Sequence, residues 1–316
     1  MTAALALALL TFQAPADRAC TAQEVAALTA LSTQPYRLTC QADLSGVDIR
    51  RRVLIEGAEG SGASLDCGGG TIRAPGPATT AAPTVAVWSR REGDRWSRPV
   101  DVTIRNCTVV GNVRIWGMGA GGSMRDLLAS SRTAGHTQAA QSAAPIRVTL
   151  DRVRFEGVGT IPLYVGPGVT RTTVTRSRFV GRSTSTAVYL DAESAGALIQ
   201  DNEFDIRTGR EQIAVDGSGA NRIVGNRLAL HGKGGVFLYR NCGEDGVIRH
   251  QTPSYNQITD NLLTGAGWLR PRAVVIGSRE GGRRYCGDDR GWPFGSSADD
   301  GDGATGNLTA RNVVRR

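Results

Sequence analysis

Short runs of alternating apolar and polar residues recur along this chain at a nearly constant spacing. The apolar residues that close four of these runs, separated by 24, 25 and 24 positions, are Phe155, Phe179, Phe204 and Leu228. Gly, Asn, Asp and Ser bound the runs, and no helical period lies between them. Such a repeat predicts a solenoid in which each coil adds three short strands to three parallel sheets.

The repeated segments are clearest at residues 187–194, 212–218 and 236–241. Each is followed by an asparagine and, two positions later, an apolar residue. This pattern resembles the right-handed parallel β-helix of the pectate-lyase-like superfamily over roughly residues 46–316. The resemblance implies an all-β fold, a right-handed parallel β-helix solenoid with an N-terminal capping helix. Leucine-rich repeats have a similar period but need a Leu-rich consensus that is absent here.

The first 45 residues predict a leader and a cap. A short apolar run and a small-x-small site predict a secretory signal peptide over residues 1–16, with an ordinary buried helix as the alternative. Residues 17–45 are expected to form an N-terminal capping segment. Within it, Thr21 and Glu24 have the spacing of a capping box and predict a short amphipathic helix.

Residues 46–316 are expected to form the β-helix, with loop insertions near 113–145, 240–256 and 279–305. The first insertion is rich in Gly, Ala and Ser with little periodicity, which is typical of a protruding loop. We expect its His136 to be exposed. Residues 299–303 are dense in carboxylates but lack the Glu of an EF-hand, so they predict a solvated turn.

Six cysteines, an even number, favour disulfides over metal binding in an apparently exported chain, which we expect to be secreted or periplasmic. No C-x-x-C motif is present, which argues against a zinc site. Sequence permits fifteen pairings. Proximity favours Cys20–Cys40, Cys67–Cys107 and Cys242–Cys286.

The net charge of +8 favours an anionic partner. The basic residues are scattered and no nucleic-acid motif with interleaved aromatic residues occurs, so an acidic polysaccharide fits better than nucleic acid. No apolar stretch reaches the length of a membrane-spanning helix. The oligomeric state is left open.

Asp191 and Asp216, 25 residues apart, fall at equivalent positions of successive coils, and Arg240 and Arg279 follow on the next two. Equivalent residues on stacked strands lie about 4.8 Å apart on one face. We therefore expect Asp191, Asp216, Arg240 and Arg279 to form a column of catalytic groups. Tyr239 adjoins the column, although its alignment with core positions would turn it inward. The alternative is that both aspartates close turns.

Long insertions leave neighbouring coils just after Arg240 and Arg279, and the Cys242–Cys286 disulfide would join them as one wall beside the column. His250 is the candidate for proton transfer near neutral pH. Arg binds carboxylates, and aromatic rings offer a platform for a sugar. The residues expected to bind substrate are Tyr189, Glu193, Asn241, Arg249, Arg283, Arg284, Tyr285 and Trp292.

Two adjacent carboxylates repel each other unless a cation lies between them. Resemblance to pectate lyases implies calcium as one such cation for Asp191 and Asp216, and no other cofactor is indicated. The recurring asparagines Asn202, Asn226 and Asn261 are expected to be structural, stacking inside a turn and bonding the backbone.

The leading functional hypothesis is an enzyme acting on a uronate-containing polysaccharide by proton abstraction, as a lyase or a C5-epimerase. Arg240 and Arg279 would neutralise the carboxylate, while His250 or Tyr239 would act as base or acid. One alternative is a glycoside hydrolase using Asp191 and Asp216, although the motifs of polygalacturonases are missing. The other is a non-catalytic glycan-binding or accessory β-helix, similar to the copper-delivery proteins of nitrous-oxide reductase maturation.

Overall fold

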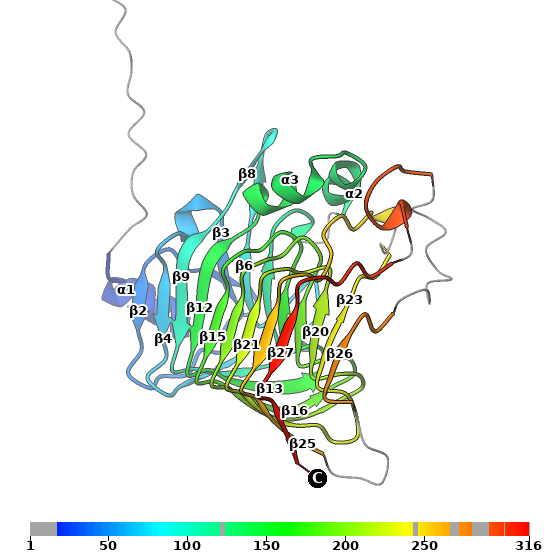
Figure 1. The fold of residues 1–316 in the computed structure, drawn as a ribbon. Helices are drawn as coiled ribbons and strands as arrows, with labels where there is room; N and C mark the ends of the chain where they lie inside the picture. Colours follow the sequence, from blue (N-terminus) through cyan, green and yellow to red (C-terminus); the bar gives the residue numbers. More distant parts are fainter. Residues whose placement is uncertain are drawn as a thin grey trace, which may run out of the picture.

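The computed structural model describes residues 18–120, 124–242, 246–265, 272–279, 291–299 and 301–315. Within them, each coil adds one strand to each of three parallel sheets, and Figure 1 shows the sheets running side by side along the molecule. Connections between parallel strands of one sheet are almost always right-handed. The right-handed parallel β-helix predicted from the repeat is confirmed.

The first sheet has nine strands, in the order β1 (Tyr36–Arg37), β3 (Val53–Glu56), β6 (Val85–Trp88), β11 (Val113–Trp116), β14 (Leu163–Val165), β17 (Val188–Leu190), β20 (Ile213–Asp216), β23 (Val236–Tyr239) and β26 (Val274–Ile276). The second sheet also has nine, β2 (Gln41–Asp43), β4 (Ser64–Asp66), β9 (Val100–Arg105), β12 (Ile146–Asp151), β15 (Thr173–Thr175), β18 (Leu198–Gln200), β21 (Arg222–Val224), β24 (Gln257–Thr259) and β27 (Leu308–Ala310).

The third sheet has eight strands, β5 (Thr71–Arg73), β10 (Thr108–Val110), β13 (Arg154–Gly159), β16 (Arg178–Ser183), β19 (Glu203–Thr208), β22 (Arg227–Ala229), β25 (Leu262–Thr264) and β28 (Val313–Arg315). A separate antiparallel hairpin is formed by β7 (Arg90–Glu92) and β8 (Arg95–Ser97). The helices are α1 (Ala22–Thr29), α2 (Arg125–Ser131) and α3 (His136–Ala143), with short 3₁₀ turns η1 (Ala58–Gly60) and η5 (Gly295–Ser297).

The interior of the coils is filled by the apolar residues that define the repeat. Phe155, Phe179 and Phe204 occupy one register position of the third sheet, and their adjacent ring centroids lie 4.4 Å apart. Leu228 and Leu263 continue the same position. Stacked coils repeat at about 4.8 Å, so identical side chains at one register position stack face to face. The period counted from the sequence therefore marks a continuous buried row.

A row of asparagines fixes the turn between the second and third sheets, as predicted. Asn226 is fully buried; its Oδ1 accepts bonds from the backbone N–H and Nδ2 of Asn202, each at 3.0 Å. Its Nδ2 donates to the carbonyl of Ile199 at 2.9 Å and to Oδ1 of Asn261 at 3.0 Å. Buried backbone groups at each turn are thereby satisfied from the neighbouring coil.

We expect Asn226→Ala to lower the free energy of unfolding by about 2–3 kcal/mol, because it leaves donors of Asn202 and the carbonyl of Ile199 buried without partners. Urea unfolding followed by circular dichroism measures the loss. The matched control is Arg227→Ala, since Arg227 is the next residue but exposed. Equal losses for the two variants would contradict a structural role for the asparagine row.

The N-terminal cap forms as predicted. Thr21 and Glu24 make the capping box of α1, and Leu28 of that helix is buried in the core. Cys20–Cys40 and Cys67–Cys107 are disulfides, which are typical of oxidising compartments. Cys286 and the predicted signal peptide lie outside the described residues, so the Cys242–Cys286 pair and export remain predictions. Among the described helices, none is long and apolar enough to cross a membrane.

The first insertion is not the loop that its composition predicts. Residues Val113–Trp116 belong to the first sheet, and the insertion that follows contains α2 and α3. Figure 1 shows both helices gathered at one side of the coils. Gly168 permits this contact, because a Cβ there would lie 2.3 Å from the backbone of Ala140 in α3. His136 is consequently 1% exposed, and the prediction that it is exposed is wrong.

Candidate functional site

Alternate side chains of the first sheet point away from the core, and most of them are aromatic or charged. The strands place them in register because the side-chain period of a strand is two residues. Tyr164 pairs with Tyr189 on the next coil, and Arg114 pairs with Tyr164. The outward residues that matter for the site are Arg114, Trp116, Tyr164, Tyr189, Asp191 and Asp216.

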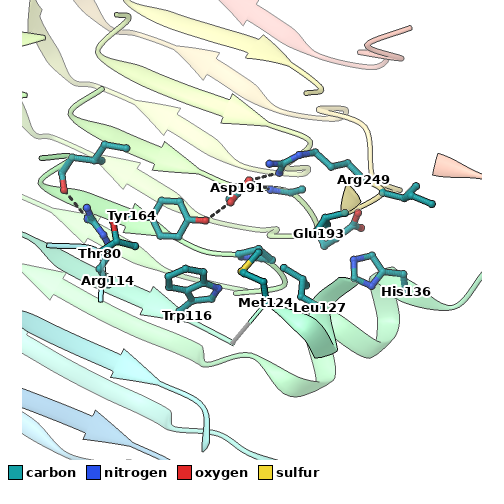
Figure 2. Close-up of a pocket in the computed structure, with 15 residues that line it drawn as sticks. Thr80, Arg114, Trp116, Met124, Leu127, His136, Tyr164, Asp191, Glu193 and Arg249 are labelled. Atoms are coloured by element: carbon teal, nitrogen blue, oxygen red, sulfur yellow. Dashed lines mark hydrogen bonds and ion pairs between the residues drawn. The ribbon is translucent and has the colours of Figure 1, made fainter. Parts of the chain in front are cut away.

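A pocket of about 290 Å³ lies over this face (Figure 2). The first sheet contributes Arg114, Trp116, Tyr164 and Asp191. The α2–α3 insertion and the segment 247–249 close it from the other side, through Met124, Leu127, His136, Val247, Ile248 and Arg249. Side chains from three separate parts of the chain therefore surround one small cavity.

Arg249 bridges the two aspartates that the sequence singled out. Its Nη1 contacts Oδ1 of Asp191 and lies 3.6 Å from Oδ2 of Asp216. Both carboxylates therefore lie on one face, as their spacing predicts. All three side chains are buried. Burial and the charge of Asp191 raise the pKa of Asp216, while the two carboxylates raise that of Arg249 well above its usual value despite burial.

The predicted column is wrong beyond Asp216. The register pairs Asp216 with Tyr239, so Tyr239 and not Arg240 occupies the next position and points outward. Its buried hydroxyl donates to Glu211 at 2.9 Å and accepts a bond from Arg210. Tyr239 does not line the pocket, which leaves it no contact with a ligand there.

Arg240 stabilises a loop instead of extending the column. Its Nη2 donates to Oδ1 of Asp299 at 2.6 Å and to the carbonyl of Gly301 at 2.7 Å. Asp302 is fully buried and accepts the backbone N–H groups of Arg240 and Arg279, each at 3.0 Å. The prediction of a solvated turn is therefore wrong for Asp302, whose carboxylate is needed to satisfy two buried donors.

Arg279 and Asn241 belong to the layer around Tyr239 and Asp216. The guanidinium of Arg279 lies 4.3 Å from the ring centroid of Tyr239 and donates to Oδ1 of Asn241. Asn241 in turn donates to Asp216 through its backbone N–H at 2.7 Å and its Nδ2 at 2.8 Å. The hydroxyl of Tyr189 fills the remaining side of Asp216 at 2.6 Å. Asp216 is thus enclosed by protein, outside the pocket.

Asp191 is the carboxylate that faces the pocket. Its Oδ2 accepts the hydroxyl of Tyr164, and its Oδ1 accepts the N–H of Ala192 at 2.8 Å as well as Arg249. Burial and the charge of Asp191 raise the pKa of Tyr164 well above that of a free phenol. Tyr164 is therefore a protonated hydroxyl linked directly to a carboxylate, an arrangement that can pass a proton between a ligand and Asp191.

Calcium does not fit between Asp191 and Asp216. Every one of their four carboxylate oxygens accepts a hydrogen bond, from Tyr164, Ala192, Arg249, Tyr189 or Asn241. Calcium takes six to eight oxygen ligands, and the guanidinium between the carboxylates would repel it. The described residues contain no cluster of three or more His, Cys, Asp or Glu that could hold a metal. The calcium expectation is wrong because Arg249 supplies the positive charge.

Glu193 links the α2–α3 insertion to the segment that carries Arg249. Its carboxylate accepts the hydroxyl of Thr137, the N–H of His250 at 2.5 Å and the N–H of Gln251 at 3.1 Å. The side chain is 1% exposed, and burial raises its pKa. Glu193 reaches the pocket wall, but its oxygens are taken by these donors. Its role is to position the walls.

His250 does not face the pocket. Its Nε2 lies 2.6 Å from the carbonyl oxygen of Ser131, so that nitrogen carries a proton and cannot act as a base. Its ring packs against His136 and Phe294, each with centroids 5.1 Å apart. The predicted proton-transfer role has no geometric support.

We expect His136 to make the fold less stable in mild acid. Burial, with the charges of His250 and Arg249, lowers its pKa from 6.5 to about 4, so between these values only the unfolded chain takes up the proton. Stability is full above pH 6.5 and falls by about 3 kcal/mol towards pH 4. Urea unfolding from pH 4 to 7 should show a shallower dependence in His136→Gln, with His231→Gln as the control. Identical profiles for wild type and His136→Gln would contradict this origin.

The remaining predicted ligands lie apart from the pocket or cannot be placed. Trp292 lies 5.1 Å from the guanidinium of Arg132 and does not line the cavity. Arg283, Arg284 and Tyr285 lie outside the described residues.

Three residues that the sequence did not indicate complete the site. Arg114 is 3% exposed and donates to the carbonyl oxygens of Val113 and Ile161, and no carboxylate among the described residues forms an ion pair with it. Burial lowers the pKa of Arg114 to about 10. Its guanidinium lies 5.5 Å from the ring centroid of Tyr164. The indole Nε1 of Trp116 is buried with no hydrogen-bond partner in the described structure.

No protein-family model and no curated protein matches the sequence. Among solved structures, the Dettilon tailspike protein matches at 12% identity with a TM-score of 0.31, over 78% of this chain and 60% of that chain. This chain thus spans less than two thirds of the tailspike.

An alginate lyase from Paenibacillus matches at 12% identity and a TM-score of 0.23, over 92% of this chain and 97% of that chain. The periplasmic alginate epimerase AlgG, as a variant, matches at 12% and 0.23, over 87% and 79%. Similarities at this level support no inference about substrate or mechanism, which must come from the site itself.

Proposed function

We propose that the pocket binds a uronate sugar of an acidic polysaccharide and transfers a proton next to the sugar carboxylate. The observation that carries this proposal is Arg114. A buried guanidinium without a carboxylate partner is costly, and a bound anion would relieve that cost. Arg binds carboxylates through two parallel hydrogen bonds. The unpartnered Nε1 of Trp116 offers a further donor on the same wall.

Proton transfer would proceed through Tyr164 and Asp191. With the uronate carboxylate held by Arg114, the phenolic oxygen would take the C5 proton as its own proton passes to Asp191. The electron pair left at C5 would be delocalised into the neutralised carboxylate, which is the step that needs a cation. Expulsion of O4 would then give a C4–C5 double bond, with the proton returned to O4. Return of a proton to the opposite face of C5 would instead invert that centre.

Arg249 supports this relay without touching the substrate. Its ion pair with Asp191 orients the carboxylate toward the Tyr164 hydroxyl. Hydrolysis by Asp191 and Asp216 has weaker support, because Asp216 is enclosed by Tyr189 and Asn241 and cannot reach a ligand in the pocket. The two confirmed disulfides fit a secreted or periplasmic enzyme.

The proposal is tested by incubating the protein with a panel of 1,4-linked polyuronates. Ultraviolet absorbance detects the double bond of a lyase, and proton exchange at C5 in heavy water, read by NMR, detects an epimerase. Reducing ends without a double bond would show hydrolysis and contradict the proposal. Binding without either reaction would identify a glycan-binding protein, and absence of both binding and reaction would reject a uronate ligand.

We expect Arg114→Gln to weaken uronate binding 10- to 100-fold, as removal of one charge-assisted contact of about 1.5–3 kcal/mol requires. Isothermal titration with a short oligouronate measures the loss. The free energy of unfolding should stay the same or rise, because the buried charge has no carboxylate partner in the described protein. Arg154→Gln is the control, since Arg154 is exposed on the third sheet. Unchanged binding in Arg114→Gln would remove the basis of the proposal.

A further inference from the structure

We infer that the pocket accepts only the reducing-end sugar of a polyuronate chain, so that the enzyme works from one end and not within the chain. This inference rests on the proposed function and specifies its substrate. It follows from which sides of the pocket are closed, from where the pocket reaches solvent, and from the chemistry of elimination.

The outward face of the first sheet is covered on both sides of the pocket. On the N-terminal coils, Leu54, Ala86 and Trp88 form a buried cluster with Trp116, and the half-buried Met124 of the insertion packs against it. On the C-terminal coils, Ala214 and Asp216 are fully buried. A polysaccharide lying along the coils would need both of these surfaces to be open. The described residues therefore leave no groove for a chain to run through the site.

The pocket is also closed at its inner end. Leu127 and His136 are each 1% exposed, and Ile248 is not exposed at all. Figure 2 shows Thr80 and Arg114 at one end of the lining and His136 at the other. Thr80 is exposed and Ile161 half-exposed, so this end reaches solvent. The structure thus gives the pocket one entrance, beside Arg114.

The size of the cavity agrees with a short ligand. Its volume of about 290 Å³ lies at the lower limit of small-molecule sites, which span roughly 300–1,000 Å³. The buried donors and the Tyr164–Asp191 pair lie inside, where they can act only on a sugar that has entered completely. A chain terminus can do so, and an internal sugar with neighbours on both sides cannot.

Elimination selects which terminus enters. The bond broken joins C4 of the uronate to O4, which carries the preceding sugar, and the electron pair from C5 forms the C4–C5 double bond. The uronate in the pocket must therefore have a sugar attached at O4, and that sugar must extend out through the entrance. Only the reducing-end unit has a neighbour at O4 and none at C1. The product would be an unsaturated monosaccharide and a chain one unit shorter.

The test compares oligouronates and polymer with the same chains after borohydride reduction, which opens the terminal ring to an alditol. We expect an unsaturated monosaccharide from the earliest time points, little fall in polymer viscosity, and at least 100-fold slower reaction of the reduced chains. If the enzyme is an epimerase, inversion should be confined to the terminal unit and should likewise be lost after reduction.

Oligosaccharide products at early times, or equal rates on reduced and unreduced chains, would overturn the terminal-unit inference while leaving uronate chemistry intact. Calorimetry gives a second reading: the affinity per chain should be independent of chain length and lost after reduction. Absence of binding and reaction with every uronate would reject both this inference and the proposed function. The two failures are therefore distinguishable.

Discussion

Arg249→Met should lower the free energy of unfolding by about 3–5 kcal/mol, the range for breaking a buried ion pair by removing one partner. Methionine keeps much of the volume, so the loss reports the charge and its hydrogen bonds. Without the guanidinium, Asp191 and Asp216 would remain buried with no cation between them. Urea unfolding at neutral pH measures the effect.

The pH dependence of the same variant identifies the cause. With the guanidinium gone, the folded-state pKa of the carboxylates rises above the unfolded value, so the folded protein takes up the extra proton and its deficit shrinks as pH falls towards 5. Adding Asp191→Asn and Asp216→Asn should recover part of the loss. The exposed Arg154→Met serves as a control. A deficit below about 1 kcal/mol, or one that does not vary with pH, would show that the pair is not electrostatically linked.

The sequence predicted the coils because the same physical constraint acts on every one of them. Each coil must present an apolar side chain to the interior at the same register position, which is why Phe155, Phe179 and Phe204 recur at nearly equal spacing. The asparagine row recurs for an equivalent reason, since each turn leaves the same backbone groups to satisfy. Features that repeat with the coil are therefore visible in a single sequence.

The position after Asp216 was mispredicted because the coils are not all of one length. Asp191 and Asp216 are separated by 25 residues, but only 23 separate Asp216 from its register partner Tyr239. A fixed period therefore shifts the prediction by one residue and replaces an outward tyrosine with Arg240. A one-residue shift exchanges the two faces of a strand. Turn lengths, which the apolar pattern does not record, decide the outcome.

The pocket itself depends on contacts that no repeat encodes. Arg249 reaches Asp191 from 58 residues away, in an insertion that occurs once. The two helices near His136 have small, weakly periodic residues, since close packing on Gly168 requires small side chains. Arg114 and Trp116 come from coils before the clearest repeats. Only the Tyr164–Tyr189 spacing of 25 residues was a usable signal, and it indicates register without showing which tyrosine faces a cavity.

On the uronate substrate that the panel identifies, Tyr164→Phe should reduce turnover by about 10²–10⁴-fold, the usual contribution of a positioned proton-transfer group. The variant keeps the aromatic ring beside Arg114 and removes the only atom that links the ligand to Asp191 in the proposed relay. The loss should therefore fall on kcat, with KM and oligouronate affinity nearly unchanged. Steady-state kinetics and calorimetry on the same protein separate the two.

Tyr189→Phe is the matched control, because Tyr189 holds the same register position one coil later and donates to the enclosed Asp216. It should lose stability through that hydrogen bond and retain turnover. If both variants keep their activity while Asp191→Asn is inactive, the carboxylate acts on the sugar directly and Tyr164 only orients it. If Tyr189→Phe loses kcat as severely as Tyr164→Phe, the reaction takes place over the neighbouring coil. Only a loss confined to Tyr164 and Asp191 agrees with a proton passing between them.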